Sequence, residues 1–161
     1  MRRAGAILGH PLYAENMRLN AEADARSAYC RHDLAHSLDV ARIASAMNLE
    51  GDMGFPRESL YAAALLHDIT KWRQLARGEK HNETAIAPAA LILADAGFSR
   101  GEAEPVLAAI LAHRSGPEKG GPHFLFARLL FLADKASRPC YACPHDNGEC
   151  DWELKNARLE W

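Results

Sequence analysis

Two aspartates in the sequence stand at positions where a buried carboxylate is expected. Asp68, together with His67, ends an otherwise apolar run that begins at Tyr61, and Asp134 interrupts a second apolar run. A carboxylate removed from water is costly unless a cation or a hydrogen-bond donor meets it. His36 falls on the apolar stripe of its own helix, where a histidine by itself is usually a hydrogen-bonded core residue. A divalent metal ion bound by two neutral imidazoles and two carboxylates satisfies all four groups at once, so the sequence predicts a metal centre.

The elements that must position these groups are helices. Apolar residues recur at helical spacing through nearly the whole sequence, and no alternating run is long enough for a convincing strand, which predicts an all-α protein. Pro11 is well placed as a first helical residue, and Ser99 with Glu102 forms a capping-box pattern. Helices are predicted over residues 11–28, 33–48, 56–67, 82–96, 99–113 and 123–137.

Length and composition limit the classes of protein that remain. With 161 residues, we expect a single domain with its core at about residues 25–138 and a tail, residues 139–161, packed on that core. Nineteen Lys and Arg against 21 Asp and Glu give a net charge of −2, which argues against a nucleic acid polymer or an anionic membrane as partner. No apolar stretch approaches the roughly 20 residues of a membrane span. The apolar patch near the N-terminus is too short for the apolar region of a signal peptide, so we expect a cytoplasmic location.

Three segments of the sequence resemble the HD-domain metal-dependent phosphohydrolases. They are His36 with Asp39-Val40-Ala41, the run Ala64-Leu65-Leu66-His67-Asp68-Ile69-Thr70-Lys71, and Ala133-Asp134-Lys135. The order His…His-Asp…Asp is that family's metal signature, and the resemblance covers about residues 25–140. It implies an HD-type helical bundle with a central metal site, held by His36, His67, Asp68 and Asp134, that takes one or two divalent ions among Fe, Mn, Mg, Co and Zn.

The resemblance also implies ligands for a second ion. His81 and His113 match the family's pattern in order and setting, and Asp68 would then bridge the two ions. Without the resemblance, His81 would be a capping or exposed residue, and His113 a favourable charge at a helix C-terminus. The remaining histidines are predicted to have surface or capping roles, namely His10, His32, His123 and His145.

Cationic side chains near the metal residues are candidates for binding phosphate. Lys71 lies one helical turn beyond Asp68, Arg114 lies near the end of the helix 99–113, and Arg138 lies one turn beyond Asp134. Each is also explicable as a solvated surface charge. Lys71 is the strongest candidate because it matches the His-Asp-x-x-Lys form of many relatives, and with Asp68 it is assigned a catalytic role; Arg73 is a weaker one.

The four cysteines are read as thiols or metal ligands rather than disulfides. Cys140, Cys143 and Cys150 have the spacing C-x2-C-x6-C, which leaves a structural zinc site one ligand short. Cys30 is the predicted fourth ligand, because it lies six residues before His36 as Cys140 lies six after Asp134. His145 is the alternative fourth ligand, a [4Fe–4S] cluster is the alternative to zinc, and four unconnected thiols are the simplest alternative to any site.

The leading hypothesis for function is a phosphohydrolase that acts on a small phosphate ester or nucleotide. A bound divalent ion lowers the pKa of a coordinated water and neutralises phosphoryl oxygens. A first alternative is a di-iron oxygenase of the same fold, since imidazole-rich sites bridged by a carboxylate suit iron. A second alternative is a regulatory module that binds a nucleotide without converting it.

Overall fold

The computed structural model describes residues 1–25, 30–143, 155, 156 and 158. These residues form nine α-helices and one short 3-10 helix and contain no strand, which confirms the predicted all-α class. The elements are α1 (Arg2–Leu8), α2 (Pro11–Asp24), α3 (Leu34–Glu50), α4 (Arg57–Leu66), α5 (Lys71–Arg77), α6 (His81–Thr84), α7 (Ile86–Asp95), α8 (Arg100–Ala112), α9 (Phe124–Ala136) and η1 (Cys140–Ala142).

Side-chain caps begin three of the long helices. His10 Nδ1 accepts a hydrogen bond from the main-chain N–H of Leu12 (3.1 Å) at the start of α2, where Pro11 is the first residue. Asp33 Oδ1 accepts one from the main-chain N–H of His36 (3.0 Å) at the start of α3. The predicted capping box of α8 is also present. These caps satisfy main-chain donors that a helix start leaves without partners.

The helices differ from the sequence-based prediction at three places. The short helices α1 and α5 were not predicted, because seven residues hold too little apolar periodicity to stand out. The predicted helix 82–96 consists of α6 and α7, separated at Ala85. Pro88 in the first turn of α7 accounts for the break, because proline has no N–H to continue the hydrogen-bond ladder. The predicted helix 11–28 ends at Asp24.

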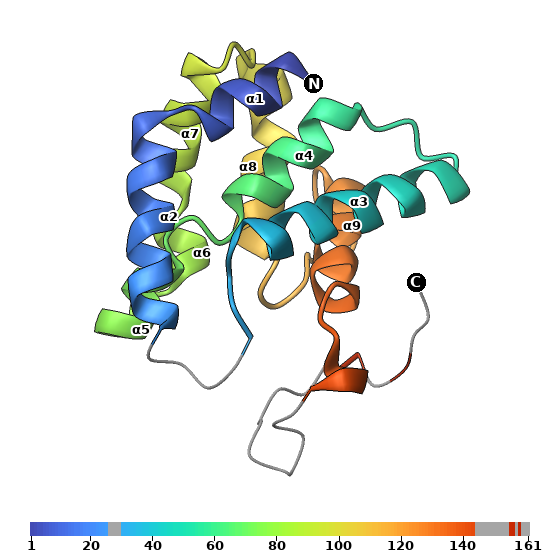
Figure 1. Ribbon diagram of the computed structural model, residues 1–161. Coiled ribbons are helices and arrows are strands. Elements are labelled where there is room, and N and C mark those ends of the chain that lie inside the picture. The colour runs from blue at the N-terminus through green and yellow to red at the C-terminus, as the bar shows by residue number, and fades with distance from the viewer. Residues whose placement is uncertain (26–29, 144–154, 157, 159–161) are drawn as a thin grey trace.

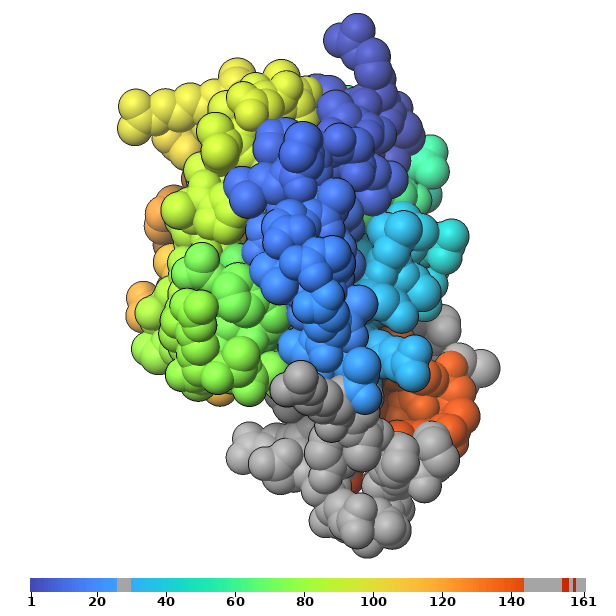
Figure 2. Space-filling model, turned by 60° about the vertical axis from the view of Figure 1, so that its left-hand side comes forward, coloured from blue at the N-terminus to red at the C-terminus, as the bar shows by residue number. Residues whose placement is uncertain are grey.

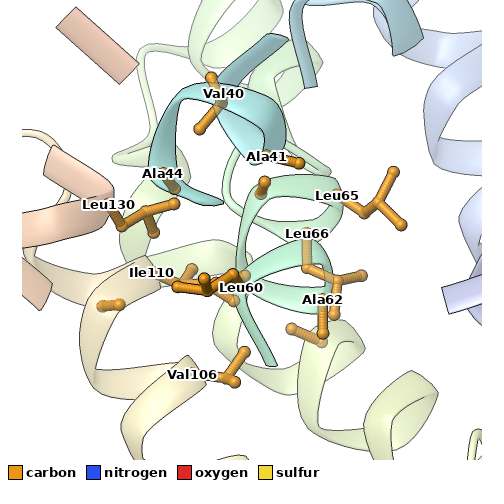
Figure 3. Packing of buried hydrophobic residues seen from close by; sticks show 14 of the residues in the cluster. Val40, Ala41, Ala44, Leu60, Ala62, Leu65, Leu66, Val106, Ile110 and Leu130 are labelled. Carbon is orange, nitrogen blue, oxygen red and sulfur yellow. The ribbon is translucent and has the colours of Figure 1, made fainter. Parts of the chain in front are cut away.

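Helix α4 lies at the centre of the bundle and positions His67 at its end. Figure 1 shows α2 and α7 on one side, α3 and α9 on the other, and α4 and α8 between them. Every residue from Ala62 to Leu66 is at most 1% exposed, and α4 packs against α1, α3, α8 and α9. In Figure 3 the side chains of Leu60 and Ile110 meet in this core, with Leu130 beside them. The C-terminal end of α4 is therefore held from several directions.

Helix α2 covers one face of the bundle. It runs down the middle of the face in Figure 2, with the green α5 and yellow-green α7 on one side and the cyan start of α3 on the other. Among the described helices, none is both long and apolar enough to cross a membrane.

Candidate metal centre

A first group of ligand atoms comes from three of the long helices. His36 lies in the first turn of α3, His67 caps the end of α4, and Asp134 lies in the last turn of α9. The Nε2 atoms of His36 and His67 are 3.3 Å apart, and they lie 3.4 Å and 3.8 Å from Asp134 Oδ1. Asp68 Oδ2 is 3.1 Å from His67 Nε2 and 3.7 Å from His36 Nε2. Four side chains from three separate segments of the sequence thus converge on one point.

A second group lies on the other oxygen of Asp68. His81, the first residue of α6, and His113, the C-cap of α8, place their Nε2 atoms 3.0 Å and 3.4 Å from Asp68 Oδ1. These two nitrogens are 2.9 Å apart. The Asp68 carboxylate therefore has one oxygen in each group, as a bridging ligand requires.

The donor atoms fit divalent metal ions. Asp68 Oδ1 is buried and has no hydrogen-bond partner, although burying a charged oxygen without a partner is costly. The short distances between Nε2 atoms place lone pairs of neutral imidazoles against each other unless a proton or a cation lies between them. Imidazole and carboxylate together suit Zn, Mn, Fe and Co. Within the described part of the chain, these two groups alone bring three ligand atoms within 4.8 Å of one another.

The four histidines share one orientation. Each turns Nε2 into the centre and holds Nδ1 against an oxygen, which fixes the ring and the nitrogen that remains free for a metal. The Nδ1 partners are Ala64 O for His67 (2.7 Å), Ile110 O for His113 (2.6 Å), Ser137 Oγ for His36 (3.2 Å) and Gln74 Oε1 for His81.

The charges of the centre shift its titrating groups in opposite directions. Burial favours the neutral form of the Asp68 and Asp134 carboxyls, but the histidines around them hold both pKa values well below the usual range. Burial opposes protonation of His67, yet the two carboxylates outweigh it and raise its pKa to about 10. Burial prevails at His81 and lowers its pKa to about 4. The second group therefore contains an imidazole that is neutral at pH 7.

Two buried residues to which the sequence analysis gave no role support the two aspartates. The Asn20 amide, on α2, donates to Asp68 O (2.9 Å) and accepts from the main-chain N–H of Trp72 (2.8 Å), so it spans the turn between α4 and α5. Lys135 Nζ donates to Asp134 Oδ2, which leaves Oδ1 facing the histidines. An amide that bonds to main chain 48 residues away leaves no local pattern in the sequence. Lys135 could have been noticed as a charge inside an apolar run.

The three cations predicted to bind phosphate lie around the centre. Lys71 begins α5 and is half-buried, and its side chain forms no hydrogen bond or ion pair with another described residue. Burial lowers the pKa of Lys71, and the charge of Asp68 acts against that shift. Arg138 Nη2 donates to Asp134 Oδ1 (3.4 Å). Arg114 is exposed, and its charge also acts on Lys71.

Arg73, the weaker candidate, is engaged elsewhere. Its Nη1 lies 3.6 Å from Glu79 Oε2, and its guanidinium carbon lies 5.2 Å from the centroid of the Trp72 ring. These contacts hold the guanidinium on the surface of α5.

The prediction for His32 was wrong. It is a buried residue, not a surface or capping one, and its main-chain N–H donates to Asp24 Oδ2 (2.7 Å). Its neighbours Arg31 and Asp33 are polar, so no apolar pattern in the sequence predicts that His32 is buried. His10 caps α2, and His123 is exposed at the start of α9. His145 lies outside the described residues.

The cysteine site stays a prediction. None of Cys30, Cys140 and Cys143 belongs to a ligand group among the described residues. Cys30 is close enough to Arg138, two residues before Cys140, for its charge to act on that guanidinium. Cys150 lies outside the described residues.

Comparison with known proteins adds family information to this geometry. Residues 33–138 match the HD domain family. A protein of Clostridium beijerinckii, described as uncharacterized, is 35% identical over 161 residues, which are 99% of each chain. Ribonuclease Y of Oleidesulfovibrio alaskensis is 29% identical over 128 residues, and that match covers 80% of this chain but 22% of the enzyme.

A solved structure shares the fold. The crystal structure of a predicted HD superfamily hydrolase from an uncultured Thermotogales bacterium superposes with a TM-score of 0.58 and 26% sequence identity. The similarity covers 76% of this chain and 66% of that one.

Proposed function

Because the chain belongs to the HD domain family, we propose that it is a metal-dependent phosphohydrolase acting on a small phosphate ester or nucleotide. The observation that carries the proposal is the position of Asp68, whose two oxygens face two separate sets of imidazole nitrogens. The structural similarity to an HD superfamily hydrolase supports the reaction class.

The residues divide into two sets of metal ligands. His36, His67, Asp68 and Asp134 would hold one divalent ion, and Asp68, His81 and His113 a second. Ions bound there would supply an activated water and would neutralise the charge of the phosphoryl oxygens.

The cationic side chains provide the substrate's binding site in this proposal. The ammonium of Lys71 has no partner within the described part of the chain and is therefore free to bind a phosphoryl oxygen. Arg138 contacts Asp134 and presents its guanidinium at the edge of the centre. Arg114, exposed on the loop after α8, suits a phosphate further from the reacting bond. Such charge-assisted contacts orient a phosphate in the site and stabilise its transition state more than water does.

The test is hydrolysis by metal-free protein supplied with Mn, Fe, Co or Mg. Substrates should include nucleotides, dinucleoside polyphosphates and p-nitrophenyl phosphate, with a short RNA added because a relative is a ribonuclease Y. We expect metal-stimulated turnover that Asp68→Ala abolishes. The matched control is Asp39→Ala, since Asp39 is exposed on α3 and pairs only with Arg42 among the described residues. Unchanged turnover in Asp68→Ala would contradict the proposal, and turnover of RNA alone would contradict the substrate class.

The ligand set also supports a second candidate function. Four histidines and two aspartates form a centre that iron occupies well, so an oxygenase is the alternative chemistry. Oxygen uptake by the iron-loaded protein in the presence of substrate separates the two, because hydrolysis consumes no O2. Tight nucleotide binding by calorimetry without phosphate release would instead favour the regulatory module.

A further inference from the structure

The buried His32 ring lies between two carboxylates. On one side its Nδ1 is 3.6 Å from Asp24 Oδ1, and on the other its Nε2 is 4.0 Å from Asp68 Oδ2. Asp24 comes from the end of α2, whereas Asp68 is the bridging carboxylate of the candidate metal centre. The ring thus connects a part of the chain before the family match with the centre itself.

Asp24 is fixed in a position that orients this ring. Its Oδ2 accepts the main-chain N–H of His32 at 2.7 Å. Its Oδ1 and His32 Nδ1 are both buried, and neither has a hydrogen-bond partner. A proton on Nδ1 would point at the charged Oδ1, which leaves the lone pair of Nε2 directed at the centre. A carboxylate behind a histidine in this manner is the usual support of a metal-binding imidazole.

The same orientation occurs in the four histidines already described. In His36, His67, His81 and His113 the Nδ1 atom is held by an oxygen and Nε2 faces the centre. His32 has the same orientation of its two nitrogens, with Nδ1 3.6 Å from the Asp24 carboxylate, a longer distance than in the other four. A histidine buried only for packing has no reason to present the same nitrogen to the same carboxylate.

The distance to Asp68 is within the range for two ligands of one ion. Ligand atoms that each lie about 2.0–2.2 Å from an ion are at most roughly 4.4 Å apart. His32 Nε2 and Asp68 Oδ2 are 4.0 Å apart. A cavity of about 370 Å³ is lined by both Asp24 and His32, so the pair borders open space beside the end of α2.

We propose that His32, oriented by Asp24, is a fifth histidine of the metal centre and a ligand of the ion on the His36, His67 and Asp134 side. The assignment rests on the proposed metal-dependent function and adds two residues to its machinery, one as a ligand and one as a positioning residue. It also predicts that this ion has a more complete protein shell than the ion beside His81.

The experiment is a titration of metal-free protein with Co2+, followed by the visible absorption of the bound ion. We expect His32→Asn to weaken binding of one ion by more than the roughly 10- to 100-fold that loss of a positioning partner costs, and to change the spectrum of that ion. Asp24→Asn keeps the size of the side chain and should weaken the same ion less. His123→Asn is the matched control, because His123 is exposed and asparagine tolerates its left-handed main chain (φ 61°). Thermal unfolding without metal checks that each variant folds. If His32→Asn does not fold, His32→Gln takes its place.

The outcomes separate this assignment from the proposed function. If His32→Asn binds Co2+ with the affinity and the spectrum of the wild type, the role of His32 is overturned, even where the wild type hydrolyses p-nitrophenyl phosphate. Weakened binding in His32→Asn, without turnover of any ester by the wild type, supports the ligand and overturns the phosphohydrolase. A wild type that binds no Co2+ overturns both.

Discussion

The two ligand groups of the centre differ in the elements that carry them and in their charge. The first is built on α3 and α9, helices of 17 and 13 residues, and on the end of the buried α4. The second uses a turn, the four-residue α6 and the C-cap of α8. In the first group the pKa of His67 is raised to about 10, and in the second that of His81 is lowered to about 4. The comparison teaches that the two oxygens of one carboxylate, Asp68, face two groups that differ in the length of their helices and in their affinity for protons.

The largest effect is expected where the two groups share a residue. Asp68→Ala removes one ligand from each group and a buried negative charge from both. We expect metal content to fall from two ions per chain to none after dialysis, and turnover to fall about 1,000-fold or more, since metal catalysis is worth several kcal/mol. Elemental analysis and initial rates measure the two losses. Retention of one ion would show that the groups are independent of their shared carboxylate.

Loss of one ion at a time tests whether the groups are separate. We expect His36→Ala to remove the ion of the first group and His81→Ala that of the second, each leaving about one ion per chain. Because the second group lies on shorter elements, its ion should be the first that a chelator removes from the wild type. Chelator titration with elemental analysis distinguishes the two variants. Loss of both ions in His81→Ala would contradict this order.

The pH dependence of metal binding should differ between the groups. His67 has a folded pKa of about 10, above its usual 6.5, so the metal-free protein keeps that proton at neutral pH and gains stability from it that is lost as pH rises toward 10. A metal ion must displace the proton, so affinity of the first group should rise about tenfold per pH unit between about pH 7 and pH 9. His81, with a pKa of about 4, adds no such slope. Co2+ titrations across this range check it, and equal slopes would contradict it.

A smaller effect is expected from the support of the turn that carries Asp68. Asn20→Leu leaves the N–H of Trp72 without its partner, at a cost of about 1–3 kcal/mol in the free energy of unfolding. It also removes one of the two donors to Asp68 O, which keeps the main-chain N–H of Lys71. Because Asp68 serves both groups, affinity for both ions should fall, measured by Co2+ titration of the folded variant. The matched control is Asn16→Leu on the same helix, which loses a bond from the Trp72 side chain and one to Leu12 O but none to the main chain of the turn. Equal metal binding in the two variants would assign Asn20 to folding alone.

Sequence reasoning was strongest where a polar residue interrupts an apolar pattern. Asp68 and Asp134 were noticed for that reason, and the structure places both beside His36 and His67. His81 has no such contrast with its surroundings, and His113, although it follows an apolar run, was also explicable as a charge at a helix C-terminus. Only the family resemblance indicated them as ligands, and the structure brings them to Asp68.

The parts that the sequence did not reveal depend on contacts between distant segments. Asn20 bonds to a turn 48 residues away, and His32 is buried only because the end of α2 returns beside it. No local period encodes either contact. The break between α6 and α7, in contrast, was readable from Pro88.

Helix α2 lies before the residues that match the HD domain family but supports the candidate metal centre. The family match starts at residue 33, yet α2 supplies Asn20 to the turn of Asp68 and packs along α5 and α7. A chain trimmed to residues 33–138 would keep six His and Asp side chains of the centre but lose His32 and Asp24. It would also expose the apolar faces that α2 covers and remove Asn20 from that turn. Transplanting this centre into another scaffold therefore requires a helix in the place of α2, with an amide at the position of Asn20.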